Sequence, residues 1–405
     1  MSDHAASVGS SPPGPPWMEL RALALLFLRL GVTAFGGPAA HIALMEDEVV
    51  RRRAWLTRDE FLDLLGATNL IPGPNSTEMA IHIGRRRAGF PGLVVAGASF
   101  ILPAAVLTAG FAWAYVRFGR LPEVSAVLYG VKPVIIAVIA QALFGLARSA
   151  VRTRRLAVLA ALAVAAILLG VNELLVLFAA GVLAALFRPA RPAGPRREAA
   201  KEEDSKPPRP GTMLSAVVPV AGGAAVSAAF GLTKLFLFFA KVGAVLFGSG
   251  YVLLAFIRAD LVERWHWLTE AQLLDAVAVG QVTPGPVFTT ATFIGYVLGR
   301  IPGAVVATAG IFLPAFFFVA VSGPLLPRIR RSAVAGAFLD GVNVASLALM
   351  AVVSVQLGRA AMVDIPTILM AFASAALVLR YRVNSAWLVL GGAAAGSAVR
   401  FLLPR

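Results

Sequence analysis

The sequence contains no cysteine and is poor in residues that carry out chemistry. Only four of its 405 residues are histidine, and charged residues make up 14% of the chain, whereas a soluble domain carries about 25%. The absence of cysteine excludes disulfides, thiolate nucleophiles and cysteine-bound metals. The apolar segments contain no nucleophile–base pair, metal cluster or HExxH motif. We therefore expect no enzyme, no catalytic residue, no metal and no cofactor.

The chain is instead rich in long apolar segments. Hydrophobic residues make up 59% of it, with many runs near or above the ~18–20 residues that a helix needs to cross a bilayer. This predicts an all-α polytopic membrane protein embedded in a lipid bilayer. The net charge of +15 would also suit nucleic acid, but most lysines and arginines lie in loops between apolar runs, as the orientation of membrane proteins requires. We therefore expect no nucleic-acid partner.

The sequence is duplicated. Matching positions lie 212 residues apart up to a Pro-Gly-Pro motif and 211 apart soon after it. Most of the shared positions are glycine or proline: Pro72-Gly73-Pro74 recurs as Pro284-Gly285-Pro286, Ile83-Gly84 as Ile294-Gly295, Pro91-Gly92 as Pro302-Gly303, and Leu102-Pro103-Ala104 as Leu313-Pro314-Ala315. Helix breakers that repeat inside apolar segments are typical of transporters built from paired repeats with discontinuous helices.

Composition divides the chain into four parts. We expect a disordered N-terminal tail at 1–19, a first transporter repeat at 20–187, a charged, proline-rich cytoplasmic linker at 188–212 and a second repeat at 213–403. The apolar stretch at 213–231 has no counterpart in the first repeat. It is either an extra span or an interfacial helix.

The basic loops indicate how the two repeats are oriented. In the first repeat they lie at 51–53, 85–87 and 148–155, and in the second at 328–331 and 380–382. A basic loop in one repeat tends to match a loop poor in cations in the other. Because cytoplasmic loops carry the excess of lysine and arginine, this pattern predicts two inverted-topology repeats of about five spans each, with broken or re-entrant helices.

Four breaks in the apolar segments are the strongest candidates for a binding site: Gly36-Gly37-Pro38, Pro72-Gly73-Pro74, Gly248-Ser249-Gly250 and Pro284-Gly285-Pro286. A helix that restarts after such a break presents unpaired N–H groups and the positive end of its dipole. These groups favour an anion. A plain kink is the better explanation of a single Pro-Gly-Pro, but two at matching positions of a repeat, each with a second break upstream, favour a site.

Two cations stand at matched positions inside apolar segments. Arg29 and Lys241 each precede a glycine break by about two helical turns. A buried cation needs a carboxylate, a cavity or an anionic ligand, so we predict that both contribute to the anion site. Snorkelling of the long side chains to the interface is the alternative.

Polar residues flank the Pro-Gly-Pro turns. Asn75, Ser76 and Thr283 can donate to an oxyanion without adding charge, so we include them in the site. Asn75 or Ser76 could equally cap the helix that restarts there.

Two ionisable residues break the repeat. Glu78 matches Thr290, and His41 matches Leu253. Asymmetric titratable groups are candidates for coupling to protons, although His41 could be a polar residue near the interface and Glu78 a counter-ion of Arg29. The acidic run 46–48 beside the arginines at 51–53 is expected to be a solvated charged turn.

The ordered set of motifs resembles the chromate ion transporter family in its two-unit form. The matching residues of the first copy are Phe35-Gly36-Gly37-Pro38, Glu48, Trp55, Pro72-Gly73-Pro74, Phe100 and Pro103, and those of the second are Lys241, Gly243, Phe247-Gly248, Trp267, Pro284-Gly285-Pro286 and Pro314. The second copy departs from Gly-Gly-Pro at Gly248-Ser249-Gly250. The resemblance implies efflux of chromate, with sulfate as the isosteric analogue, from a multi-pass protein of the bacterial inner (plasma) membrane.

These observations predict a secondary transporter that exports a tetrahedral oxyanion. Protons are a candidate coupling ion, and a homodimer is a candidate assembly. An anion channel, or a sulfate importer that uses the same site, is the alternative. The residues themselves indicate a site for an anion, and chromate rests on the resemblance.

Overall fold

The computed structural model describes residues 16–35, 37–119, 121–187, 230–247, 252–381, 383 and 385–402, with only the backbone at 323–331. Several predicted features lie outside these ranges. They are the tail before residue 16, the linker 188–212, the stretch 213–229, Gly36 and the break Gly248-Ser249-Gly250.

The described residues form helices joined by turns, without a β-strand, which confirms the all-α prediction. In the first unit the helices are α1 (Pro16–Thr33), α2 (Gly37–Glu46), the π-helix η1 (Asp47–Arg52), α3 (Arg58–Thr68), α4 (Asn75–Phe118), α5 (Pro122–Ala150), α6 (Arg154–Leu168) and α7 (Glu173–Leu186). In the second unit they are α8 (Leu232–Val245), α9 (Leu253–Ile257), η3 (Arg258–Arg264), α10 (Glu270–Val282), η4 (Val287–Thr289), α11 (Thr290–Arg331), α12 (Ala333–Ala361), α13 (Ile365–Tyr381) and α14 (Ser385–Leu402). Helix α1 begins before residue 20, so the last residues of the expected tail are helical.

The two units repeat their local structure closely. Thr57 and Thr269 each form a capping box, with Glu60 and Gln272 respectively, at the starts of α3 and α10. The π-helices η1 and η3 also fall at matching positions. These shared details show that the duplication extends to backbone geometry.

Helices α4 and α11 are each a tight helical hairpin. The backbone leaves helical geometry at Ala88-Gly89 in α4 and at Gly299-Arg300 in α11. On either side of the first bend the chain packs so closely that a Cβ on Gly84 would overlap the carbonyl of Gly92. Each Pro-Gly-Pro turn therefore joins a short helix, α3 or α10, to the first arm of a hairpin, as a re-entrant segment requires.

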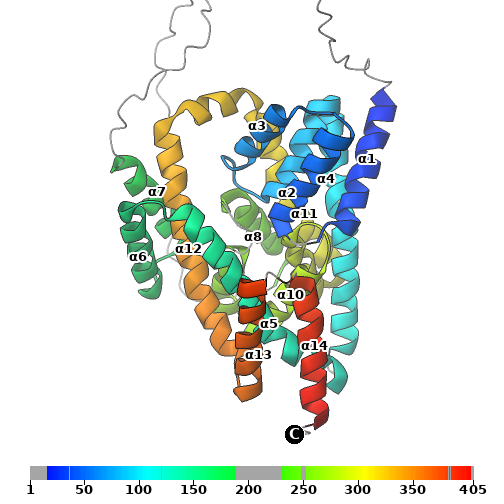
Figure 1. Ribbon diagram of the computed structural model, residues 1–405, viewed down its shortest axis with the longest axis vertical. Coiled ribbons are helices and arrows are strands. Elements are labelled where there is room, and N and C mark those ends of the chain that lie inside the picture. The colour runs from blue at the N-terminus through cyan, green and yellow to red at the C-terminus, as the bar shows by residue number, and fades with distance from the viewer. Residues whose placement is uncertain are drawn as a thin grey trace, which may run out of the picture.

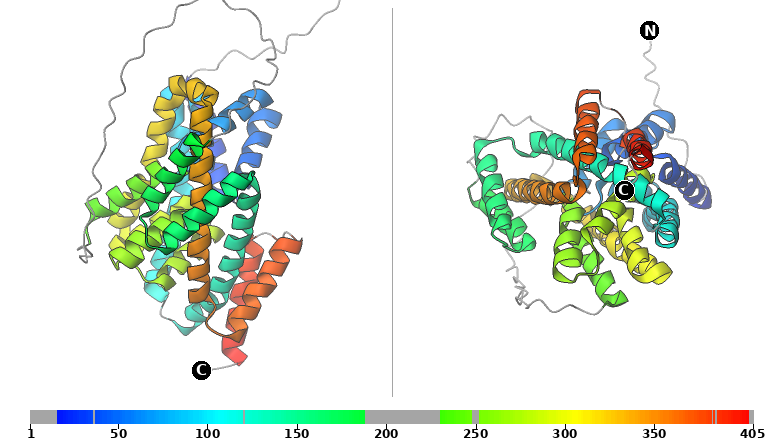
Figure 2. Two further views of the ribbon diagram at one scale, coloured as in Figure 1. Left: turned by 90° about the vertical axis from the view of Figure 1, so that its left-hand side faces the viewer. Right: turned by 90° about the horizontal axis from the view of Figure 1, so that it is seen from below.

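The two units are inverted relative to each other. Helix α4 ends at the lower end of the molecule, where α5 begins, whereas α11 ends at the upper end, where α12 begins (Figure 1). The side view in Figure 2 shows α12 running from this upper end towards the lower end. Five helical segments are long and apolar enough to cross a membrane within the described residues: 75–118, 122–150, 287–322, 333–361 and 385–402.

The units also interlock. Helix α5 of the first unit packs against α13 and α14 of the second, and α12 of the second packs against α6 and α7 of the first. Small residues permit these contacts. A Cβ on Gly130 in α5 would lie 2.6 Å from the nitrogen of Gly396 in α14, and one on Gly341 in α12 would lie 2.7 Å from Cβ of Ala184 in α7.

Candidate anion site between the two units

The Pro-Gly-Pro turns lie inside the protein. Pro74, Pro284, Gly285 and Pro286 are buried, as is Gly73, while Pro72 is half-buried. Gly73 has φ +139° and Gly285 has φ +88°, a range that side chains with a Cβ rarely adopt. A Cβ on Gly285 would also lie 2.7 Å from Cβ of Ala104. Both turns therefore require glycine for conformation and for space.

Each turn is hydrogen-bonded to the break of the other unit. The amide of Gly73 donates to the carbonyl of Leu246 at 2.8 Å, and the amide of Gly285 donates to the carbonyl of Ala34 at 2.9 Å. Leu246 and Ala34 occupy matched positions just before the second and first glycine breaks. The structure thus brings the two turns and the approaches to the two breaks together as a reciprocal pair.

The two turns also begin helices that face this junction. Helix α4 begins at Asn75 after Pro74, which provides no side-chain cap, and η4 with α11 begins after Pro286. The first N–H groups of a helix have no carbonyl partner within it. Across the unit boundary, the hydroxyl of Thr108 in α4 lies 3.2 Å from that of Thr289. The junction therefore combines two helix starts with neutral hydroxyl groups.

Other predicted site residues take structural partners. The Asn75 side chain donates to Asn69 at 3.0 Å, and the Thr283 hydroxyl donates to the carbonyl of Val279 at 2.7 Å. Ser76 is buried on the first turn of α4. Gly37 begins α2 with φ +79° and open space around its Cα.

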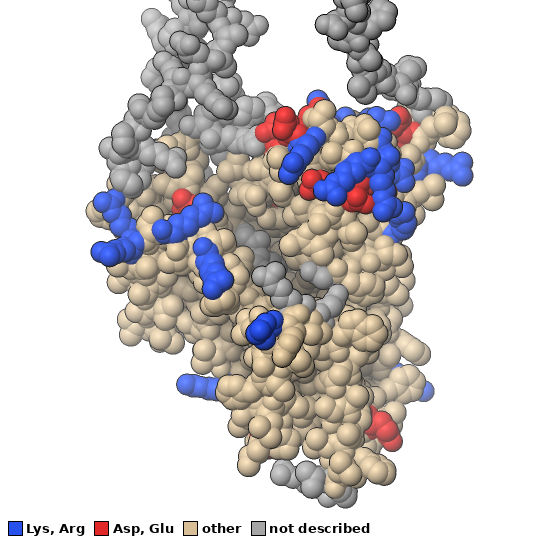
Figure 3. Space-filling view, in the orientation of Figure 1, with Lys and Arg blue, Asp and Glu red and all other residues tan. Residues whose placement is uncertain are grey.

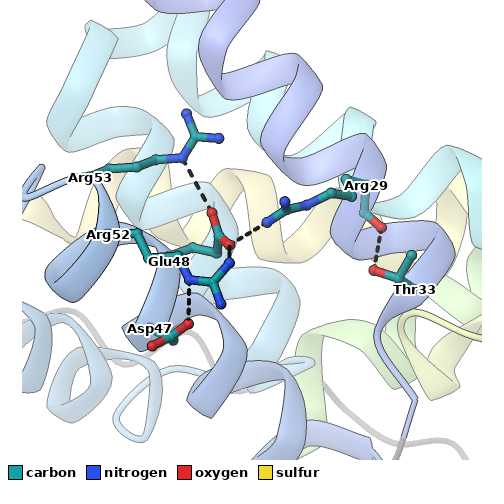
Figure 4. A network of polar contacts seen from close by, with 6 residues as sticks. All are labelled: Arg29, Thr33, Asp47, Glu48, Arg52 and Arg53. Atoms are coloured by element: carbon teal, nitrogen blue, oxygen red, sulfur yellow. Dashed lines mark hydrogen bonds and ion pairs between the residues drawn. The ribbon is translucent and has the colours of Figure 1, made fainter.

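Arg29 lies in an ion-pair cluster at the side of the first break. Its guanidinium contacts the carboxylate of Glu48 in η1, which also binds Arg52 at 3.1 Å and Arg53 at 3.4 Å (Figure 4). Glu48 is only 5% exposed. The expectation of a solvated turn at 46–48 is therefore wrong for Glu48, because three arginines hold its carboxylate inside the protein.

The second unit repeats this arrangement with different residues. The ammonium of Lys241 contacts Asp260 in η3, and Arg264 binds the same carboxylate at 2.8 Å. Glu48 and Asp260 are 212 residues apart, as are Arg29 and Lys241. Each predicted cation is thus one of two or three cations that share a single carboxylate.

Glu78 and His41 both lie inside the first unit. Glu78 is fully buried beside Gly73, and neither carboxylate oxygen has a hydrogen-bond partner. It is therefore not the counter-ion of Arg29, because Glu48 has that role. His41 is 1% exposed and contacts the carbonyl of Ala34 through Nε2 at 3.1 Å. That contact ties it to the first break and not to the membrane surface.

A second cross-unit contact involves charges. Lys132 in α5 binds Asp275 in α10 at 3.2 Å, and Tyr115 in α4 donates to the same carboxylate at 2.9 Å. In the other unit, Asn343 matches Lys132, Asp63 matches Asp275 and Leu326 matches Tyr115. Nothing in the sequence indicates that Asp275 faces Lys132 across the unit boundary.

A surface pocket lies away from the junction, at the bend of the first hairpin. It is lined by Trp55, Leu56, Glu60, Ile83, Arg86 and Arg87. Arg86 pairs with Glu60 at 2.8 Å. The hydrogen bond from Arg86 lowers the pKa of the Glu60 carboxyl below its usual value. Because its arginines already have acidic partners, this pocket is a weaker anion site than the junction.

Sequence comparison identifies the family. The model of the chromate transporter family matches residues 21–185 and, separately, 233–397. The chain belongs to this family. Its two matched regions coincide with the two inverted units of the structure.

Relatives with functional names cover nearly the whole chain. The chromate transport protein of Cupriavidus metallidurans is 34% identical over 94% of this chain and 92% of its own length. The probable chromate transport protein of Synechococcus elongatus is 32% identical over 87% and 88%, and the chromate transport protein of Pseudomonas aeruginosa is 30% identical over 94% and 93%. No solved structure matches the chain.

Proposed function

We propose that this protein is a secondary transporter that exports chromate across the inner (plasma) membrane of a bacterium, with sulfate as an analogue. The observation that carries the proposal is the reciprocal docking of each Pro-Gly-Pro turn on the break of the other unit. Two inverted units joined at matched helix starts are the arrangement expected of a carrier with a site between its repeats. The names of the relatives support chromate as the anion.

The hydrogen bonds suggest how the site opens. Gly73–Leu246 and Gly285–Ala34 are equivalent contacts on inverted units, so releasing one or the other exposes the junction from opposite sides. The anion is held by the first amides of α4 and of η4, which follow the two Pro-Gly-Pro turns, and by nearby hydroxyls. The clusters around Arg29 and Lys241 supply positive charge beside the breaks. Burial of the turns favours such a carrier over an open channel.

The membrane potential can drive this export. Moving two negative charges outward releases about 4.6 kcal/mol per 100 mV of inside-negative potential. An exporter of a dianion therefore needs no chemical fuel.

Proteoliposomes loaded with chromate test the proposal. We expect efflux that saturates with chromate, is accelerated by a potential negative inside and is inhibited by sulfate. Currents that do not saturate would indicate a channel, and the absence of flux by well-folded protein would rule out chromate.

Matched variants test the junction. Gly73→Ala and Gly285→Ala should each reduce efflux more than tenfold, because an added Cβ overlaps Glu78 or Ala104 and strains a positive-φ turn. Gly110→Ala is the control, since Gly110 lies in α4 with open space around it. Equal efflux in all three variants would remove the turns from the site.

A further inference from the structure

The first turn of α4 holds a group of buried polar atoms without partners. Both oxygens of Glu78 and the hydroxyl of Thr77 lack a hydrogen-bond partner, and so does Nε2 of His82 one turn further along. Thr77 and Glu78 have no exposed surface at all. Buried polar groups are almost always satisfied, so this helix start is built to meet something else.

The matching helix start in the second unit has no such deficit. Thr289 stands at the place of Thr77 and donates to the carbonyl of Pro286 at 2.8 Å. Thr290 stands at the place of Glu78 and donates to the carbonyl of Val287 at 2.8 Å. Both helix starts follow a Pro-Gly-Pro turn that is bonded to the matched residue of the other unit. They differ because the polar side chains of the second start all have hydrogen-bond partners, and only the first start has a residue that can carry a charge.

Other charged groups on the neighbouring elements leave Glu78 unpaired. The hydrogen-bond and ion-pair contacts of Arg29 go to Glu48 and Thr33, and Arg85 donates to the carbonyl of Val319 in α11. Against the turn itself α11 presents the apolar Ala315. The other titratable or charged side chains described on the elements packed against α4 are Glu19 and Arg21 on α1, His41 and Glu46 on α2, Arg58, Asp59, Glu60 and Asp63 on α3, Glu270 and Asp275 on α10, and Arg300 on α11, with His82, Arg86, Arg87 and Arg117 on α4 itself.

An ionised Glu78 does not fit this environment. A carboxylate buried without a partner is strongly disfavoured, and it would repel a dianion bound at the same helix start. A protonated Glu78 removes the charge and provides a hydroxyl donor beside the hydroxyl of Thr77. Both donors then lie at the end of α4 where anions are favoured.

We propose that the start of α4 binds the oxyanion together with one proton, which Glu78 holds as a carboxylic acid. The inference rests on the proposed function of anion transport. The enclosed carboxyl that the structure shows is the protonated form. When the site is open to water and empty, Glu78 can release this proton to solution, and it takes one up again when the anion binds and the site closes. One dianion and one proton then cross together, so one net negative charge moves per cycle, and the membrane potential drives this export with half the free energy that the dianion alone would release.

Chromate binding to the purified full-length chain tests this, measured by calorimetry in two buffers of different ionisation enthalpy over a pH series. The number of protons taken up per anion should rise towards one as the pH rises past the titration of Glu78 in the free protein. Beyond that point, the affinity should fall about tenfold per pH unit. Glu78→Gln should bind chromate with no proton uptake and no such pH dependence. Glu78→Thr, which copies the second unit, should behave in the same way.

Controls separate the possible failures. Glu60→Gln removes a carboxyl at the surface pocket and should leave proton uptake unchanged. Persistent uptake in Glu78→Gln, or its loss in His82→Gln alone, would overturn the assignment to Glu78. Chromate binding by the parent protein without proton uptake at any pH would overturn the proton site but keep the transporter. No chromate binding at all would overturn both.

Discussion

The two units keep the same backbone but present different chemistry at their outer ends. In the first unit, Arg53 and Arg87 lie over the ring of Trp55 at 5.0 and 5.3 Å. At the matching end of the second unit, Trp265 replaces Arg53 and packs on Trp267 with ring centroids 4.6 Å apart. The inverted arrangement places these ends on opposite sides of the membrane. Cations suit the cytoplasmic side, and aromatic rings suit either interface.

The surface reflects this division of charge. In the face shown in Figure 3, most charged side chains lie in the upper part of the molecule. The junction in the middle, by contrast, keeps both Pro-Gly-Pro turns and the matched carboxylates Glu48 and Asp260, and differs in Glu78, which matches Thr290. The comparison teaches that the units differ in charge at the ends near the membrane surfaces, whereas the turns that meet at the junction are the same.

The largest expected effect concerns the interlocking helices, where the units have not diverged. Gly130→Leu and Gly341→Leu should each destabilise the protein by about 3 kcal/mol or more, because the new side chain overlaps backbone of the partner helix. Thermal unfolding in detergent measures the loss. Gly145→Leu is the matched control on α5, with open space around it. A similar loss in all three variants would contradict the close contacts.

The matched carboxylates should come next. Glu48→Gln and Asp260→Asn each leave cations without a counter-charge in a partly buried cluster, at a cost of about 3 kcal/mol. The loss should be greater for Glu48, because it binds three arginines and Asp260 binds two cations. Unfolding of the single variants and of the double variant Arg29→Gln/Glu48→Gln checks this, since the second change should recover part of the loss.

Giving the bend of the first hairpin the residues of the second unit should affect the orientation of the protein in the membrane more than its stability. The triple variant Arg85→Tyr, Arg86→Val and Arg87→Leu gives the first hairpin the residues of the second unit. It removes positive charge that anchors the cytoplasmic side, so a larger fraction of the molecules should insert upside down. The chain has no cysteine, so one cysteine introduced near the hairpin and an impermeant thiol reagent report the orientation. Unchanged labelling would show that other loops set the topology.

The smallest effect concerns the contribution of Glu60 to the stability of the protein at low pH. The pKa of Glu60 is lowered by the hydrogen bond from Arg86, so its contribution to stability is present at neutral pH and is lost as the pH falls through that lowered pKa. Glu60→Gln copies Gln272, which keeps the capping box. Unfolding should be measured for both proteins from pH 7 downward. At neutral pH the variant should be less stable than the parent by less than about 1 kcal/mol, because the Glu60–Arg86 pair is exposed. The variant should lose less stability in acid than the parent.

The sequence predicted the duplication, the helical membrane fold, the inversion and the two Pro-Gly-Pro turns, because glycine, proline and basic loops mark these features locally. It did not predict that Gly73 and Gly285 use their amides to bind the other unit, since backbone partners leave no trace in residue type. The partners of Arg29 and Lys241 were missed for another reason. Glu48 and Asp260 follow the same 212-residue spacing, but a charged run is usually solvated, and only packing shows that Glu48 is enclosed.

The interlocking of α5 with α13 and α14, and of α12 with α6 and α7, has a consequence for biosynthesis. Helices α6 and α7 leave the ribosome long before α12 is made, so they remain exposed to lipid until α12 is inserted and packs against them. Neither half can complete its packing until the last helix has been inserted. A chain that stops at the linker is therefore an unfinished product, open to proteolysis, and not a smaller working transporter.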